Sequence, residues 1–226
     1  MARNFATENG FGQRVRAGFT RGDSGVIRFW TIVHVWSQAM PRPRLFDEEE
    51  VLDRAMRTFW AKGYRETSVE DLVAATGVRA GSLYNAFPGG KHGMFLAALE
   101  RYSRLVVPQK LGELAAETAG VTELRAYFDG LVADLTTEDG RAGCLMVNSA
   151  AELGHRDIDV SRAVSAHMRR LERNATRALR NAGVDDPEAR AKLLVATAFG
   201  LMVVGKTNPG EETLTTIVDS AFADLQ

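Results

Sequence analysis

Apolar residues recur at steps of three and four positions over most of the chain, beginning near residue 46. This spacing is typical of amphipathic helices, because it places the apolar side chains on one face. Four acidic residues at 47–50 open the first such segment and Gly63 closes it, as expected of a helix start and a helix stop. No run of β-branched residues in strict alternation indicates a strand. We therefore predict an all-α fold. The apolar stripe of the first helix consists of Phe46, Leu52, Ala55, Met56, Phe59 and Trp60.

The same periodicity predicts eight further helices. Thr67 and Glu70 have the spacing of a capping box at the start of the second helix, which Gly77 ends. Pro108 is expected to end the fourth helix, because proline cannot continue one. After the second helix, the predicted ranges are about 83–87, 91–106, 121–136, 144–153, 157–182, 187–204 and 211–225.

The segment between the second and third helices carries the most information about function. Residues 75–79 (ATGVR) form a short turn with a central glycine between two short amphipathic helices, which is the helix-turn-helix signature. In that motif the second helix lies in the DNA major groove, where arginine reads guanine and asparagine reads adenine. The alternative is a pair of packed helices with no partner. The predicted outward side chains are Arg79, Ala80, Gly81, Ser82 and Asn85.

Composition and charge narrow the class of protein. The 226 residues carry a net charge of -1, which excludes a polybasic protein that coats nucleic acid over its whole surface. Residues 1–39 and 40–104 are net positive, whereas residues 105–226 are net negative. The single cysteine excludes an internal disulfide framework and a zinc site built from several thiolates. We expect a cytoplasmic protein with no cofactor.

Two apolar stretches are too short to span a membrane. Residues 26–36 are interrupted by Arg28 and His34, although a poor signal peptide is conceivable there; residues 193–204 fit a buried helix. No membrane segment is predicted. Residues 1–39 show no clean period, so we predict a disordered or weakly helical extension. A second interpretation is that Met40 is the natural start and that the preceding residues come from an upstream start-codon assignment.

Residues 42–102 resemble the N-terminal DNA-binding domain of the TetR family of transcriptional regulators. The similarity covers about 60 residues and rests on several specific motifs. These are the Arg-x-Arg arm at 42–44, Phe-Trp and Gly-Tyr at the end of the first helix, Thr-Ser at 67–68, Gly-Val at 77–78, Ser-Leu-Tyr-x-x-Phe at 82–87 and the lysine at 91.

The resemblance implies a role for individual residues. Arg42 and Arg44 would form a flexible arm that reaches phosphate or the minor groove. Phosphate contacts are implied for Thr67, Ser68, Tyr84 and Lys91, and base contacts for Arg79, Ala80, Gly81, Ser82 and Asn85. The sequence departs from the family at Arg79, where a serine or threonine usually caps the recognition helix; arginine cannot cap.

The resemblance also implies the organisation and function of the whole chain. Residues 40–90 would form the helix-turn-helix domain, and residues 91–226 a helical domain for effector binding and dimerisation. The last two helices would pair two copies, with Ala196 and Gly200 permitting close approach. The implied protein is a homodimeric, ligand-responsive repressor that binds a palindromic double-stranded DNA operator and a small-molecule effector. Candidate ligand-binding residues are Leu96, Phe128, Leu131, Cys144, Met146, Asn148 and His167.

Two alternative functions remain open. Gly143-Cys144 resembles a TetR subgroup in which some members sense electrophiles or oxidants; a helix N-terminus and nearby Arg141 would lower the pKa of this thiol. Against that, free cysteine is often only a small buried residue. A helical enzyme or metal-binding bundle is the remoter alternative. Glu152, His155, Asp157 and Asp159 lack a second ligand pair, Asp157 is more simply a helix cap, and no nucleophile elbow is present.

Overall fold

The structure, a computed structural model, describes residues 3–9, 13–21, 27–35 and 46–225 and divides the chain into two compact units. The first unit contains strands β1 (Arg3–Asn9), β2 (Gln13–Arg21) and β3 (Ile27–Val35). They form an antiparallel sheet in the order β1-β2-β3, with Phe5 opposite Ala17 and Ala17 opposite Thr31. The prediction of a disordered or weakly helical segment is therefore wrong for these strands.

The sequence of the first unit contains a strand signal. Apolar residues at 15, 17 and 19 alternate with Arg16, Gly18 and Thr20, and residues 27–35 are rich in β-branched and aromatic types. A strand is stabilised by hydrogen bonds to a neighbouring strand rather than within its own segment. The pattern of one segment by itself therefore predicts a strand less well than it predicts a helix.

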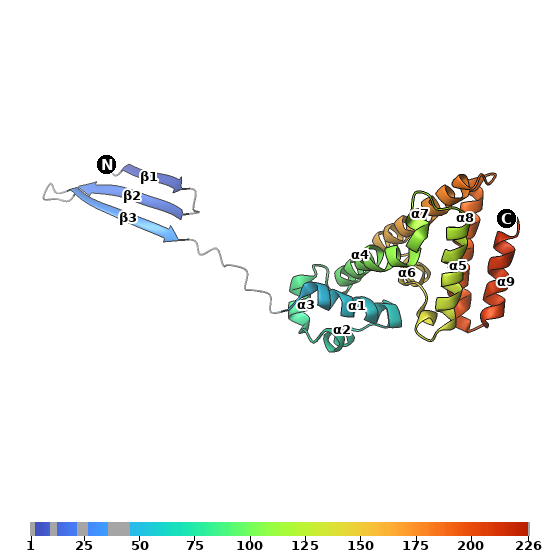
Figure 1. The fold of residues 1–226 in the computed structure, drawn as a ribbon. Helices are drawn as coiled ribbons and strands as arrows, with labels where there is room; N and C mark the ends of the chain where they lie inside the picture. Colours follow the sequence, from blue (N-terminus) through green and yellow to red (C-terminus); the bar gives the residue numbers. More distant parts are fainter. Residues whose placement is uncertain (1–2, 10–12, 22–26, 36–45, 226) are drawn as a thin grey trace. The chain divides into compact units, whose positions relative to one another are not determined.

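Residues 46–225 confirm the all-α prediction for the second unit. The nine α-helices described here are α1 (Glu48–Lys62), α2 (Val69–Thr76), α3 (Ala80–Ala86), α4 (Gly90–Leu111), α5 (Val121–Thr136), α6 (Leu145–Leu153), α7 (Ile158–Asn181), α8 (Pro187–Val204) and α9 (Glu211–Phe222). Short 3-10 turns occupy 112–115, 140–142 and 205–207. Helices α1, α2 and α3 gather at one end of this unit, and α5, α8 and α9 pack together at the other (Figure 1).

Two local predictions about helix ends are wrong. Pro108 lies inside α4, in its last turn, where the missing N–H removes only one helical hydrogen bond. The capping box at α2 pairs Ser68 with Asp71 instead of Thr67 with Glu70. Asp157 does cap α7 as predicted, because its carboxylate accepts hydrogen bonds from the N–H groups of Asp159 and Val160.

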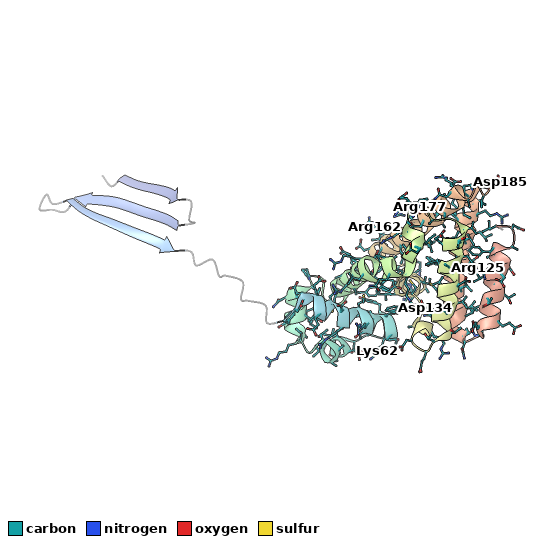
Figure 2. The ribbon with its side chains drawn as sticks, in the orientation of Figure 1. Lys62, Arg125, Asp134, Arg162, Arg177 and Asp185 are labelled. Carbon is teal, nitrogen blue, oxygen red and sulfur yellow. The ribbon has the colours of Figure 1, made fainter. Side chains whose placement is uncertain are left out.

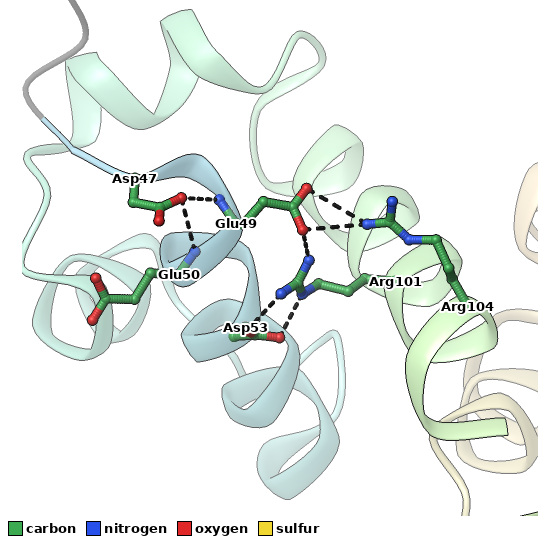
Figure 3. A network of polar contacts seen from close by, with 6 residues as sticks. All are labelled: Asp47, Glu49, Glu50, Asp53, Arg101 and Arg104. Atoms are coloured by element: carbon green, nitrogen blue, oxygen red, sulfur yellow. Dashed lines mark hydrogen bonds and ion pairs between the residues drawn. The ribbon is translucent and has the colours of Figure 1, made fainter. Parts of the chain in front are cut away.

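A charged network joins α1 to α4 (Figure 3). The side chain of Arg101 on α4 is only 7% exposed, and its guanidinium binds both carboxylate oxygens of Asp53 on α1, with Nη2 2.6 Å from Oδ2. Arg101 also pairs with Glu49, which Arg104 approaches from the next turn of α4 at 3.3 Å. Fork-shaped pairing of this kind fixes the relative register of two helices as well as their contact.

Replacement of Arg101 by methionine is expected to lower the free energy of unfolding by about 1–2 kcal/mol, because a buried charge-assisted hydrogen-bond set is lost while the apolar volume is kept. Urea denaturation followed by circular dichroism measures this loss. The matched control is Arg54→Met, since Arg54 forms only an exposed pair with Glu50 one helical turn away and should cost less than about 0.5 kcal/mol. Equal losses in both variants would contradict a stabilising role for the network.

Candidate nucleic-acid interface and internal cavity

The helix-turn-helix prediction corresponds to α2 and α3. Gly77 ends α2 in the left-handed conformation (φ 72°), which glycine adopts without strain, and the chain turns directly into α3. Leu83 is buried and anchors α3 against the other helices. Arg79 stands at the start of α3 and makes no side-chain capping bond, as the sequence predicts. Of the predicted base-reading set, Ala80 is half-buried, whereas the exposed members are Arg79, Gly81, Ser82 and Asn85.

The predicted phosphate-binding residues differ in how they are placed. Thr67 is fully buried, and its hydroxyl donates a hydrogen bond to the carbonyl of Gly63 at 2.6 Å. The prediction that this hydroxyl faces a phosphate is therefore wrong for this structure. Ser68 is exposed at the start of α2, but its hydroxyl is engaged with Asp71 in the capping box. Arg42 and Arg44 lie outside the described residues.

Lys91 and Tyr84 lie near the first turn of α4. The Nζ of Lys91 donates to the carbonyl of Thr67 at 2.6 Å and sits 4.4 Å from the ring centroid of Tyr64. Tyr84 is 48% exposed and rests against Gly90, where an added Cβ would lie 2.8 Å from the tyrosine ring. Tyr84 thus packs with one side and faces solvent with the other. Its packing on Gly90 is therefore compatible with the phosphate contact that the family resemblance implies.

The carboxylate of Asp71 holds the start of α2 in place. Lys62 at the end of α1 donates to it at 2.6 Å, and the N–H and hydroxyl of Ser68 also donate to it. These interactions, led by the hydrogen bond from Lys62, lower the pKa of Asp71 to about 2. The ion pair and the capping box together connect α1 to α2.

An internal cavity of about 260 Å³ lies behind these helices. Most of its wall is apolar or aromatic, and the described residues bring to it side chains from α1, α4, α5, α7 and α8. The charged pair formed by Lys110 on α4 and Asp134 on α5 lies at its exposed edge (Figure 2 labels Asp134). The lining residues that matter for the argument below are Trp60, Tyr102, Tyr127, Cys144, His167 and Met202.

Three polar side chains meet in the wall of this cavity. The hydroxyl of Tyr102 donates to the Sγ of Cys144 at 3.4 Å, and that sulfur lies 3.9 Å from Nε2 of His167. The imidazole of His167 stacks on Phe199 with ring centroids 5.9 Å apart. Desolvation by burial is the main cause that lowers the pKa of His167 to about 4, and it raises the pKa values of Cys144 and Tyr102.

The thiol-sensor alternative needs a lowered pKa at Cys144, whereas burial raises it. The buried position of Cys144 agrees with the other interpretation, that of a small buried residue. Cys144 stands at the N-cap position of α6 without a side-chain capping bond, and backbone N–H groups of that helix favour its thiolate, but burial outweighs them. The positive charge that acts on the thiol is that of Lys206 rather than that of Arg141, whose guanidinium donates to the side-chain oxygen of Asn208 at 3.0 Å.

Three of the seven predicted ligand-binding residues line the cavity: Leu131, Cys144 and His167. The other four do not. Phe128 packs on Phe222 with ring centroids 5.2 Å apart, Met146 is buried, Asn148 donates to the carbonyl of Ala142, and Leu96 packs against the core. Helical phase explains two of these, because Phe128 directly follows the lining residue Tyr127 and Met146 lies two positions after Cys144, so both point to another face.

The sequence interpretation treated Trp60 as core alone, but this residue links the cavity to the DNA-binding helices. Its ring lines the cavity, although it belongs to α1, and its Nε1 donates to the carbonyl of Gly143 at 2.9 Å. At the other end of α6, the carboxylate of Glu152 accepts hydrogen bonds from the backbone N–H groups of Tyr64 and Arg65, just after α1. Both contacts join residues more than 80 positions apart, so no local sequence signal identifies them.

The suggested metal-ligand set is not assembled. Glu152 is engaged with the backbone of Tyr64 and Arg65, and Asp157 caps α7 and lies 2.6 Å from His92. Within the residues that the structure describes, no group of three or more histidine, cysteine or carboxylate side chains is placed to hold a metal ion.

Two family models match the chain and together cover more than half of it. Residues 51–98 match the model of bacterial regulatory proteins of the tetR family, and residues 120–220 match the C-terminal domain of LmrA/YxaF-like transcriptional regulators. This chain belongs to the TetR family. As a TetR-family protein it is a transcriptional regulator, with the helix-turn-helix in α2 and α3.

Individual relatives agree with the family assignment. The Escherichia coli transcriptional repressor ComR is 36% identical over 133 residues, which span 58% of this chain and 63% of ComR, less than two thirds of its length. The uncharacterised Bacillus subtilis regulator YezE is 28% identical over 82% of this TetR-family chain and 100% of its own length.

Solved structures share the fold. A cysteine mutant of the TetR family regulator CifR, complexed with 26bp double-strand operator DNA, has a TM-score of 0.68 and 28% identity over 81% of this chain and 99% of its own. The reduced form of Escherichia coli NemR has a TM-score of 0.67 at 22% identity, over 76% of this chain and 93% of its own. In the described part of this TetR-family chain, no helix is both long enough and apolar enough to cross a bilayer.

The low pKa of Asp71 predicts a pH-dependent stability. Because the pKa in the folded protein is about 2, below its ordinary value of 3.8, the stabilisation from this carboxylate is present above about pH 4. It is lost as the pH falls towards 2. We expect the stability advantage of the native chain over Asp71→Asn, measured by urea denaturation, to shrink over this range. In a Lys62→Met background the folded-state pKa lies closer to the ordinary value, so the loss should be smaller and should be complete at a higher pH. An unchanged profile would contradict the role of Lys62.

Proposed function

We propose that this protein is a ligand-responsive repressor that binds a palindromic DNA operator as a homodimer. The observation that carries the proposal is the placement of Trp60, which belongs to α1, the helix that packs against α2 of the helix-turn-helix, and also forms part of the cavity wall. A molecule bound in the cavity then contacts the element that positions the recognition helix.

The DNA partner is supported by the face that α3 presents. Arg79, Ser82 and Asn85 are exposed on this helix and carry the donor and acceptor groups suited to base edges. We assign phosphate contacts to Tyr84, Lys91 and the start of α2 at Ser68, all of which lie near α3 or the first turn of α4. The complex of CifR, which has the same fold, with operator DNA supports DNA as the partner.

The homodimer is supported by an unpartnered apolar stripe on α8. One side of this helix is buried in the unit through Leu194, Val195, Ala198, Leu201 and Met202. On the other side Leu193 is 54% exposed and Val203 is 53% exposed, with the small residues Ala196 and Gly200 exposed between them. Exposed apolar side chains on a helix mark an association surface, and the small residues permit close approach of a second helix.

Ligand response requires that the effector prefer one of two arrangements of the recognition helices. Helix α6 is the natural intermediary, because its start lies at the cavity and its last turn holds the end of α1 through Glu152. A ligand that displaces the Trp60 ring or Gly143 therefore changes the support of α1, and with it the placement of α2 and α3.

The thiol sensor stays a second hypothesis because Cys144 lines the same cavity. Its burial and raised pKa oppose fast reaction with oxidants, since the thiolate is the reactive form. We therefore favour reversible binding over covalent sensing. Replacement of Cys144 by serine separates the two: loss of oxidant-induced or electrophile-induced release from DNA supports the thiol sensor, and unchanged release removes it.

DNA recognition is tested with the DNA upstream of the protein's own gene. Binding is expected to be sequence-specific and to weaken steeply with salt, because phosphate contacts release counterions. Tyr84→Phe should weaken binding to all sequences by about 2–10-fold, the loss of one phosphate hydrogen bond. Asn85→Ala should instead change the preferred sequence. Fluorescence anisotropy measures both effects.

The matched control is Tyr127→Phe, which removes a tyrosine hydroxyl at the cavity instead of one on α3. This variant should leave DNA affinity unchanged in the absence of an effector. Equal affinity of the native protein for upstream and scrambled DNA would rule out the repressor.

The dimer is tested by Leu193→Glu. A carboxylate in the apolar stripe, at its Leu193 end, should raise the dimer dissociation constant about 100-fold, because it becomes desolvated without a partner. Sedimentation velocity measures the change, and circular dichroism verifies the fold. Leu105→Glu on α4, at another exposed leucine, is the control and should remain dimeric. If Leu193→Glu leaves the dimer dissociation constant unchanged, the interface does not lie on this stripe.

A further inference from the structure

The hydroxyl of Tyr127 on α5 belongs to the cavity wall and forms a hydrogen bond with none of the described residues. Protein encloses this hydroxyl, because desolvation by burial is the main cause that raises its pKa, and the nearby Cys144 adds to the shift. The side chain is nevertheless only half-buried, and its oxygen is not closed off from contact. A group that protein encloses but leaves accessible faces an internal space. The hydroxyl of Tyr127 therefore points into the cavity.

The other polar side chains at the inner end of the cavity already have partners within the chain. Nε1 of Trp60 donates to a backbone carbonyl, and the hydroxyl of Tyr102 donates to the Sγ of Cys144. Nε2 of His167 lies 3.9 Å from the same sulfur, and its Nδ1 is closed off from the cavity. A polar group enclosed by protein is destabilising unless it finds a partner. Among these described residues, Tyr127 is the one whose hydrogen-bonding capacity is left for an occupant.

Helix α5 sets the length of the cavity. Tyr127, Leu131 and Asp134 all line it and follow one another at steps of four and three, so they share one face of the helix. This stretch of helix rises about 10 Å. At its outer end lie the charged side chains of the wall, the Lys110–Asp134 pair and Asp139, which are at least partly exposed. Since no described charge is buried beside Tyr127, an ion held there would lose its hydration without compensation.

We propose that the cavity binds a neutral hydrocarbon with a single hydroxyl group, an apolar alcohol or phenol, and that this hydroxyl pairs with the hydroxyl of Tyr127. A hydroxyl fits this position because the phenol of Tyr127 has both a donor and an acceptor free, and a hydroxyl can pair with either. A volume of about 260 Å³ suits a molecule of one or two rings. The proposal rests on the proposed function in one respect: this molecule would be the effector.

Two naphthalenes of nearly equal shape test the proposal with the full chain. 2-Naphthol carries the hydroxyl, and 2-methylnaphthalene replaces it by a methyl group. Equilibrium dialysis gives both dissociation constants, and their ratio is the preference for the hydroxyl. We expect the native chain to bind 2-naphthol at least as tightly as 2-methylnaphthalene, although water solvates the naphthol better. In Tyr127→Phe, which removes only one oxygen, the preference should fall about tenfold, the effect of one hydrogen bond in an enclosed site.

Tyr102→Phe is the matched control. It removes a hydroxyl from the same wall, but one that already donates to Cys144. The preference for 2-naphthol should therefore stay within about twofold of the native value, as for residues that do not share a partner. Circular dichroism verifies that both variants fold. The comparison of the two probes in the native chain does not depend on either variant.

The proposal is overturned if neither probe binds the native chain, if the native chain prefers 2-methylnaphthalene, or if folded Tyr127→Phe keeps the native preference. An equal fall in Tyr102→Phe also overturns it, because the loss would then reflect a general disturbance of the wall. Dialysis contains no DNA, so these outcomes are separate from the repressor proposal, which fails instead if the protein shows no preference for its upstream DNA. 2-Naphthol that binds as expected but leaves DNA affinity unchanged overturns the effector role.

Discussion

The placement of α1 is the constraint on which the rest of the helical unit depends. On one side Arg101 and Arg104 of α4 hold its first turns through Asp53 and Glu49. On the other side α6 holds its last turn, through the indole of Trp60 and through the backbone that follows α1. Helix α3 also packs on α4, through the buried Leu83 and through Tyr84 on Gly90, and Lys91 of α4 donates to the carbonyl of Thr67 before α2. A change in either support of α1 is therefore transmitted to the recognition helix.

These supports differ in how readily a bound molecule can alter them. The Arg101 network is formed by several charge-assisted bonds and includes none of the residues that line the cavity. The Trp60 bond is a single neutral hydrogen bond next to Cys144, with the ring itself in the cavity wall. A single bond of this kind contributes about 1 kcal/mol. That is small enough for a ligand to reverse and large enough to shift the population of two states severalfold.

Periodicity predicted the helices of the second unit well, because the spacing of apolar residues within one segment marks its buried face. The segments 121–136 and 187–204, for example, have the predicted bounds. The exposed face of α3 was likewise predictable from its polar residues. The cavity was not, because Trp60 and Glu152 act through partners more than 80 residues away. Thr67 illustrates the limit of transferring a role by motif, since a hydroxyl in the expected position is turned inward to the carbonyl of Gly63. The strands of the first unit were not predicted either, because a strand is stabilised by hydrogen bonds to another segment of the chain.

The pKa directions in the cavity restrict the kind of switch that it can support. Burial keeps His167 neutral, with a pKa of about 4, and raises the pKa values of Tyr102 and Cys144. All three groups are therefore uncharged near neutral pH, and protonation does not change the field inside the cavity there. A signal that reaches α1 from this site must arise from shape and from hydrogen bonding. Both act directly on Trp60 and Gly143, the contact through which, in the proposed function, an effector would change the support of α1.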